Sequence, residues 1–203
     1  MKTSNKFTLS RIIFAPFFFI IYNLPIWAHS VPLARASAWI LIPLLAIFEL
    51  TDYFDGHYAR KNGEVSDFGK LFDPFADVIL NITVFFCALH SFAGAESGYL
   101  PTVILILIVY REFSITFLRM IATKEGIAIA ARKGGKLKTV FYIASGFFFL
   151  ALESALRLGV DAAAAVPALR TAAVVLFAAC LVLSYVSFID YVVHFSSVIK
   201  KNV

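Results

Sequence analysis

Six apolar stretches, each long enough to cross the hydrocarbon core of a bilayer, divide this sequence from end to end. A membrane-spanning helix needs about 20 predominantly apolar residues. Hydrophobic residues make up 61% of the chain, whereas roughly half is typical of soluble domains. The sequence therefore predicts an all-α, polytopic membrane bundle of six transmembrane helices, with residues 1–203 forming a single domain. We place the six spans near 8–28, 37–60, 71–94, 100–122, 137–156 and 168–195.

Basic residues are unevenly distributed between the ends of these segments. One side would hold both termini and the stretches 61–70 and 119–138, and with them 14 of the 18 lysines and arginines, counting Arg11 and Arg60. Cytoplasmic loops of membrane proteins are enriched in these residues. We therefore expect a multi-pass protein of the cytoplasmic (inner) membrane with both termini in the cytoplasm. The basic residues gather at helix ends, which favours contact with anionic lipid headgroups and disfavours binding of nucleic acid.

Four aspartates flank the polar linker between the second and third segments. With small residues and an arginine they form the pattern D-x2-D-G-x2-A-R-x8-G-x3-D-x3-D. Carboxylates within membrane segments are costly to bury and are usually functional. On helices, each aspartate pair falls on one face beside small residues, so the two faces could enclose divalent cations and let a ligand approach the backbone. The eight positions are Asp52, Asp55, Gly56, Ala59, Arg60, Gly69, Asp73 and Asp77.

All eight positions match the signature of the CDP-alcohol phosphotransferases, and the six-span plan extends this resemblance over the full chain. The resemblance implies transfer of a phosphatidyl group from a CDP-linked lipid to an alcohol, with Mg²⁺ or Mn²⁺, two ions, at the site. It assigns the catalytic base to Asp77 and metal binding to Asp52, Asp55, Asp73 and Asp77. By the same resemblance, the nucleotide would contact Gly56, Ala59, Arg60, Ser66 and Gly69.

The chemistry of such a transfer suits these residue types. Divalent cations neutralise the charge of the pyrophosphate and stabilise the leaving phosphate. Such hard cations prefer oxygen ligands, which aspartates supply. A carboxylate must also take the proton from the attacking hydroxyl group.

A second motif, Asn5-x2-Thr8-x2-Arg11, opens the first segment. Two interpretations stay open. Asn5 could cap a helix while Arg11 reaches toward lipid headgroups. Alternatively, since the family has a similar opening near its substrate cavity, these residues could support the site.

Basic residues in the fourth segment and in the linker after it form a third group. Arg111, Arg119, Lys136 and Lys138 are candidates for binding the phosphate of an acceptor alcohol, because Arg and Lys suit phosphate. The alternative is a structural ion pair of Arg111 with an acidic side chain such as Glu112 or Glu49. The strings R-E-F…L-R and G-K-L-K-T resemble the phosphatidylglycerophosphate synthase branch of the family, although that branch usually has Lys where this chain has Val78.

The expected reaction joins CDP-diacylglycerol and sn-glycerol 3-phosphate to give phosphatidylglycerophosphate and CMP, a step of phospholipid biosynthesis. One alternative is a sister enzyme that uses inositol phosphate, serine or choline; the basic strings favour a phosphorylated acceptor. An alternative from another class is a cation channel or transporter, which would not need the Gly-Ala-Arg spacing. Family members often form homodimers, but the sequence marks no dimer face. It also assigns no role to Glu49, Glu112, Glu153 or Asp190.

Overall fold

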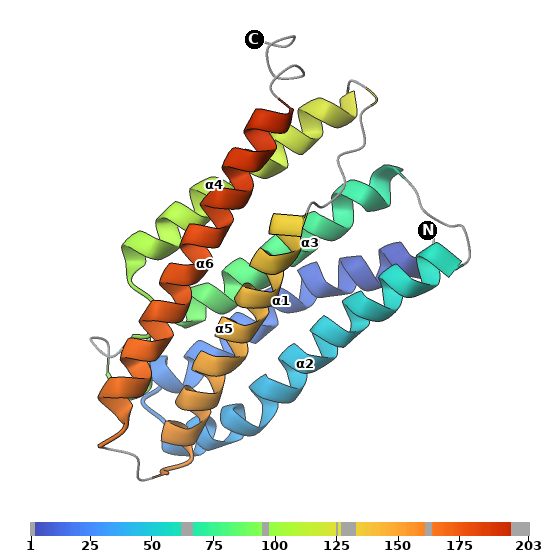
Figure 1. Ribbon diagram of the computed structural model, residues 1–203. Helices are drawn as coiled ribbons and strands as arrows, with labels where there is room; N and C mark the ends of the chain where they lie inside the picture. Colours follow the sequence, from blue (N-terminus) through green and yellow to red (C-terminus); the bar gives the residue numbers. More distant parts are fainter. Residues whose placement is uncertain are drawn as a thin grey trace.

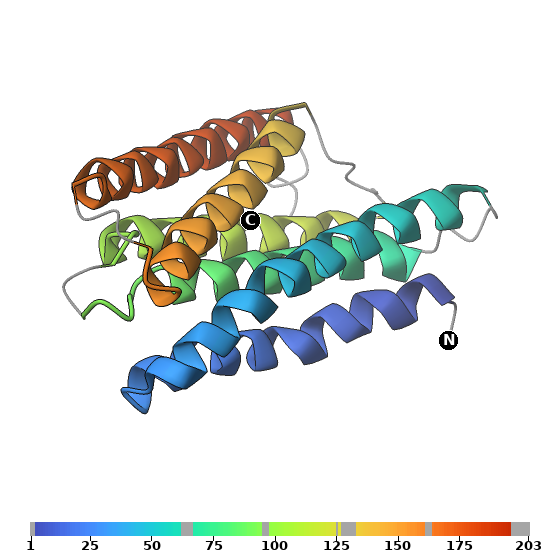
Figure 2. The ribbon, with the colours of Figure 1, turned by 90° about the horizontal axis from the view of Figure 1, so that it is seen from below.

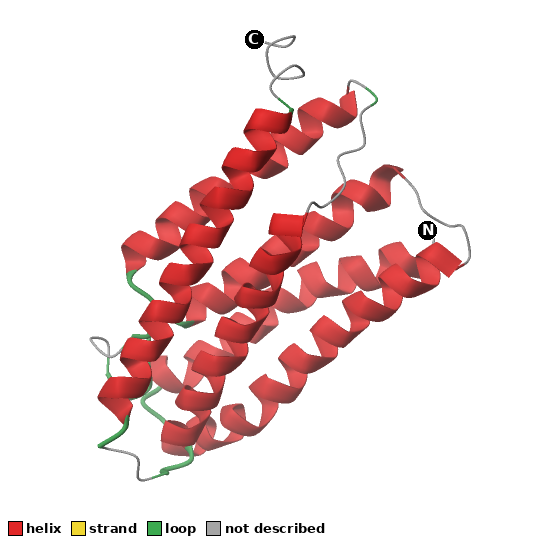
Figure 3. Cartoon of the chain, in the orientation of Figure 1, coloured by secondary structure: helices red, strands yellow, loops and turns green. Residues whose placement is uncertain are grey.

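The computed structural model describes residues 3–61, 67–94, 98–124, 126, 133–160 and 164–195, and these residues form helices joined by short loops (Figure 3). The helices run roughly along one direction, and α1 begins at the end of the bundle where α6 ends (Figures 1 and 2). The predicted all-α helical bundle is confirmed. In chain order the helices are α1 (Thr3–Trp27), α2 (Val31–Lys61), α3 (Asp67–Cys87), α4 (Thr102–Lys124), α5 (Lys133–Arg157) and α6 (Val166–His194).

Helix boundaries differ from the predicted spans most clearly at the end of α3. The sequence predicts a third span that reaches residue 94, but α3 ends at Cys87. The chain then turns, and the backbone N–H groups of Tyr99 and Leu100 donate to the carbonyl oxygen of Ala88 at 2.8 and 3.1 Å. Gly94 has a φ of 132°, a conformation that favours glycine. The residues after Cys87 are apolar enough to extend a span, yet they pack as a loop.

Four helical segments within the described residues are long and apolar enough to cross a membrane. They support a multi-pass membrane protein. The other two helices, α3 and α4, contain charged residues of the predicted site within their length, such as Asp77 and Arg111. The four candidate spans are Thr8–Trp27, Val31–Thr51, Gly134–Arg157 and Val166–His194.

Aromatic side chains join the helices in the core. Phe85 of α3, Phe149 of α5 and Phe177 of α6 are all fully buried. The ring centroids of Phe85 and Phe177 are 5.0 Å apart in an edge-to-face arrangement, a geometry that aromatic pairs prefer. Gly146 lies where α5 approaches α3, since a Cβ atom there would be 3.2 Å from Val84 Cγ1. This packing fixes α3, α5 and α6 around the candidate site.

A buried polar network lies toward the C-terminal end of α5, where Glu153 and Arg157 form an ion pair of 2.7 Å between Oε1 and Nε. The Glu153 carboxylate also accepts hydrogen bonds from the hydroxyl groups of Ser91 and Tyr99 at 2.7 and 2.8 Å. Arg157 Nη1 donates to Ser37 Oγ at 2.7 Å. Because buried charges are costly unless they are paired, we interpret Glu153 as a structural residue that ties α5 to α2 and to the loop after α3.

Candidate active site

Two aspartates of the motif, Asp73 and Asp77, lie one turn apart on α3 and both contact α1. Thr8 Oγ1 donates a hydrogen bond to Asp73 Oδ1 at 2.6 Å, and Arg11 forms an ion pair with Asp77. Thr8 is fully buried and only 1% of Arg11 is exposed. Arg11 therefore lies against a motif carboxylate, as the supporting interpretation of the N-terminal motif requires.

The remaining motif residues belong to the end of α2 and to the linker after it. The α2 helix runs through Asp52, Asp55, Gly56, Ala59 and Arg60, but their side chains lie outside the described residues, as does all of Ser66. Gly69 is buried in the first turn of α3. Among the side chains that the structure describes, no three His, Cys, Asp or Glu residues form a group that could hold a metal ion. The predicted four-aspartate metal site thus stays a prediction.

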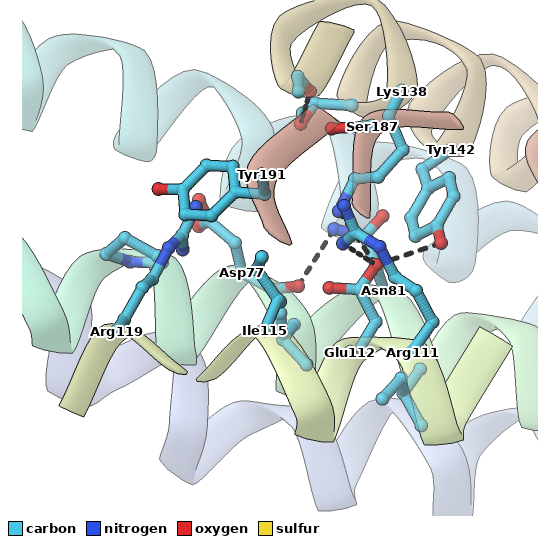
Figure 4. A pocket seen from close by; sticks show the side chains of 15 residues that line it. Asp77, Asn81, Arg111, Glu112, Ile115, Arg119, Lys138, Tyr142, Ser187 and Tyr191 are labelled. Carbon is cyan, nitrogen blue, oxygen red and sulfur yellow. Dashed lines mark hydrogen bonds and ion pairs between the residues drawn. The ribbon is translucent and has the colours of Figure 1, made fainter. Parts of the chain in front are cut away.

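A cavity of about 140 Å³ opens beside Asp77, between α3, α4, α5 and α6 (Figure 4). Its walls bring together three of the four predicted acceptor-binding residues, Arg111, Arg119 and Lys138. Lys136 is exposed and does not line the cavity, because two residues along a helix turn the side chain by about 200° from Lys138. The polar side chains of the walls are Asp77, Asn81, Arg111, Glu112, Arg119, Lys138, Thr139, Tyr142, Ser187 and Tyr191. We call this cavity the polar pocket.

Glu112 is the centre of the hydrogen bonds in the polar pocket, whereas the sequence predicts it only as a possible ion-pair partner of Arg111. Its Oε1 atom accepts from Arg111 Nη1, Lys138 Nζ and Tyr142 OH, each at 2.9 Å. The Nε atom of Arg111 donates to the carbonyl oxygen of Ser184 at 2.8 Å. The ion pair proposed as the alternative for Arg111 is therefore present, and the same arginine also lines the pocket. One feature of the sequence is consistent with this arrangement. Lys138 and Tyr142 are one helical turn apart, so both side chains lie on the same face of α5.

Arg119 is the third cation of the polar pocket. Its guanidinium carbon lies 5.8 Å from the centroid of the Tyr191 ring, within the range of a cation–π contact. Its Nε atom is buried and has no hydrogen-bond partner within the part of the chain described. Arg119 also lines an adjoining apolar groove of about 590 Å³, formed by α3 and α4 with the phenylalanines Phe72, Phe75, Phe113 and Phe117. A polar and an apolar surface thus meet at this arginine.

Comparison with known proteins decides the family. A family model described as CDP-alcohol phosphatidyltransferase matches residues 1–199. The chain belongs to the CDP-alcohol phosphatidyltransferase family. The match covers α1 to α6, so the contacts of α1 and the polar pocket are both parts of the family domain.

Curated relatives match the chain over most of its length. A Treponema pallidum protein named CDP-diacylglycerol–glycerol-3-phosphate 3-phosphatidyltransferase is 34% identical over 205 residues, covering 99% of this chain and 92% of that protein. A Bacillus subtilis protein of the same name is 38% identical over 142 residues, 66% of this chain and 69% of its own. A probable phosphatidylglycerophosphate synthase of Mycobacterium tuberculosis is 35% identical over 190 residues, 93% of this chain and 79% of its own.

Proposed function

We propose that this protein transfers the phosphatidyl group of CDP-diacylglycerol to sn-glycerol 3-phosphate, releasing CMP and forming phosphatidylglycerophosphate. The observation that carries the proposal is the polar pocket, in which Asp77 shares walls with Arg111, Arg119 and Lys138. A carboxylate beside three cations suits an acceptor that has both a hydroxyl and a phosphate group. The names of the relatives specify the same reaction.

In this reaction, Asp77 accepts the proton of the acceptor hydroxyl group. The hydroxyl oxygen then forms a bond to the phosphorus atom of the phosphatidyl group, while the bond from that phosphorus to the CMP oxygen breaks. Arg111, Arg119 and Lys138 hold the acceptor phosphate, and this places the acceptor hydroxyl group near Asp77. Holding the reacting groups close together lowers the entropic cost of the reaction. The adjoining apolar groove supports the proposal, since a lipid headgroup could reach the pocket while its tails remain in an apolar environment.

We also propose that Mg²⁺ or Mn²⁺ assists the transfer. Asp73 and Asp77 supply hard oxygen donors one turn apart, which suits such ions, and Asp52 and Asp55 would complete the ligand set. The ions would neutralise the charge of the pyrophosphate. The nucleotide would lie along Gly56, Ala59, Arg60, Ser66 and Gly69. Lys and Arg residues are enriched at this end of the bundle, which supports an inner-membrane protein whose active site faces the cytoplasm.

The test is an assay of purified protein in lipid nanodiscs with CDP-diacylglycerol, Mn²⁺ and a panel of acceptors. We expect CMP release and a phosphatidylglycerophosphate product with sn-glycerol 3-phosphate, and neither with serine, choline or inositol phosphate. Excess EDTA should abolish the release, and added Mg²⁺ or Mn²⁺ should restore it. Release that depends on another acceptor would contradict the proposed substrate, and full activity in EDTA would contradict the proposed metal.

A further inference from the structure

Glu112 of α4 is hydrogen-bonded to α5 across the polar pocket. The backbones of α4 and α5 make no close contact over the described residues, since α4 packs on α3 and α6 whereas α5 packs on α2, α3 and α6. Across the pocket between them, Glu112 Oε1 accepts hydrogen bonds from Lys138 Nζ and Tyr142 OH of α5. The same oxygen accepts from Arg111 Nη1 of α4. Figure 4 shows the three donors converging on this carboxylate.

We propose that Glu112 is a positioning residue for acceptor binding, which holds Arg111 and Lys138 side by side so that both cations face one phosphate group. The inference rests on the proposed function, because it assumes that the polar pocket binds a phosphorylated alcohol. Two like charges on separate helices repel each other. A carboxylate oxygen bonded to both cations offsets that repulsion and holds them close together.

The charge of the polar pocket fits this role. Arg111, Arg119 and Lys138 bring three positive charges, Glu112 brings one negative charge, and Asp77 is paired with Arg11. Two positive charges are left, and a phosphate monoester carries about −1.5 to −2 near pH 7. Glu112 therefore positions the cations while leaving enough positive charge for the acceptor phosphate.

The direction in which the KM for sn-glycerol 3-phosphate changes distinguishes a positioning role of Glu112 from a purely electrostatic effect. In Glu112→Gln the pocket gains one net positive charge, so electrostatics alone predicts tighter binding of the acceptor and a lower KM. Positioning predicts the opposite. Because a displacement of about 1 Å can reduce catalytic efficiency by about 100-fold, we expect the KM for sn-glycerol 3-phosphate to rise about 10- to 100-fold. The KM for CDP-diacylglycerol and kcat at saturating acceptor should change by less than about threefold.

Glu153→Gln is the matched control. Glu153 is as buried as Glu112, is paired with an arginine and accepts a hydrogen bond from a tyrosine hydroxyl. It lies about 22 Å along α5 from the level of Lys138. This variant should lower the Tm and leave the acceptor KM unchanged. An equal rise of acceptor KM in both variants would show that Glu112 is merely structural and would overturn the proposal.

A second comparison tests whether Glu112 acts through its two cations. In a background of Arg111→Ala and Lys138→Ala, Glu112→Gln should cause no further rise of acceptor KM, because residues that act as a unit are non-additive. A further tenfold rise would contradict the positioning role. If Glu112→Gln does not fold, Tyr142→Phe removes one of the three donors and keeps the charge, and it should raise the acceptor KM a few-fold. An unchanged KM there would count against the proposal.

Acceptor binding can also be measured in the absence of turnover. The measured quantity is the increase in the Tm of the protein when sn-glycerol 3-phosphate is added. The wild type should be stabilised, and Glu112→Gln should be stabilised less at the same concentration. A wild type that is stabilised but releases no CMP would contradict the proposed reaction and leave the pocket intact. Equal stabilisation of both proteins would overturn the role of Glu112.

Discussion

Thr8 of α1 donates a hydrogen bond from Oγ1 to Asp73 Oδ1 at 2.6 Å, across 65 residues of sequence. One turn farther along both helices, Arg11 pairs with Asp77. Each of the two motif carboxylates on α3 thus has a buried partner on α1. Hydrogen bonds to metal-binding carboxylates orient them and affect metal affinity, so these contacts from α1 would orient Asp73 and Asp77 toward the proposed metal ions.

The variant Thr8→Val tests this orientation of Asp73. It keeps the shape of the side chain but removes the hydroxyl donor, and hydrogen bonds to charged groups contribute about 1.5–3 kcal/mol. We expect kcat/KM to fall about 10- to 150-fold, with a higher Mn²⁺ concentration needed for half-maximal activity. The measurement is CMP release over a Mn²⁺ titration. Thr8→Ser, which retains the hydroxyl group, should stay close to the wild type, and wild-type Mn²⁺ dependence in Thr8→Val would exclude the role.

Arg119→Ala should mainly weaken use of the acceptor. Loss of one charge-assisted contact to phosphate costs about 1.5–3 kcal/mol, so the KM for sn-glycerol 3-phosphate should rise about 10- to 150-fold, while the KM for CDP-diacylglycerol barely changes. Lys136→Ala is the control, because Lys136 is exposed outside the polar pocket. Steady-state kinetics with each substrate varied in turn give both constants. Equal losses for the two substrates would identify Arg119 as a structural residue.

The sequence alone does not predict which of the two lysines, Lys136 or Lys138, lines the polar pocket. The all-α fold follows from the length and apolar character of its segments, and two residues of the aspartate pattern, Asp73 and Asp77, lie on α3 in contact with α1. The two lysines, however, are chemically equivalent in the sequence. The packing of α5 on α3 and α6 determines which face of α5 lines the polar pocket. The hydrophobic pattern of a helix that is buried on several sides does not show which face this is.

The sequence predicts Glu112 as a possible ion-pair partner of Arg111, and that pair is present, but it does not predict the bonds of Glu112 to Lys138 and Tyr142. Glu112 is adjacent to Arg111 in sequence, and neighbouring helix residues point about 100° apart, so the sequence alone did not show that both side chains face Lys138. The end of α3 at Cys87 was also missed, because the following loop is held by Tyr99 and by buried contacts with Glu153. These contacts join distant parts of the chain, and local apolar pattern carries no information about them.

Arg157→Met should destabilise the protein without changing its specificity. Removing one partner of a buried ion pair typically costs about 3–5 kcal/mol, because the other charge is left buried. We expect a clear fall in Tm in detergent micelles, with the KM values of both substrates unchanged at temperatures where the variant is folded. The double variant with Glu153→Gln should lose less stability than the sum of the two single variants. Additive losses would show that the two side chains stabilise the protein independently.

Asp77→Asn separates proton acceptance from substrate binding. The amide keeps the size of the side chain but cannot take the proton of the acceptor hydroxyl, so kcat should fall by about 10²–10⁴-fold. Since Asp77 is also a proposed metal ligand, the assay is run at saturating Mn²⁺, and both substrates should still raise the Tm. Asp190→Asn, an exposed aspartate on α6 outside the polar pocket, is the control and should turn over normally. Near-normal turnover of Asp77→Asn would remove Asp77 as the base, whereas loss of substrate stabilisation would show that its carboxylate is needed to assemble the pocket.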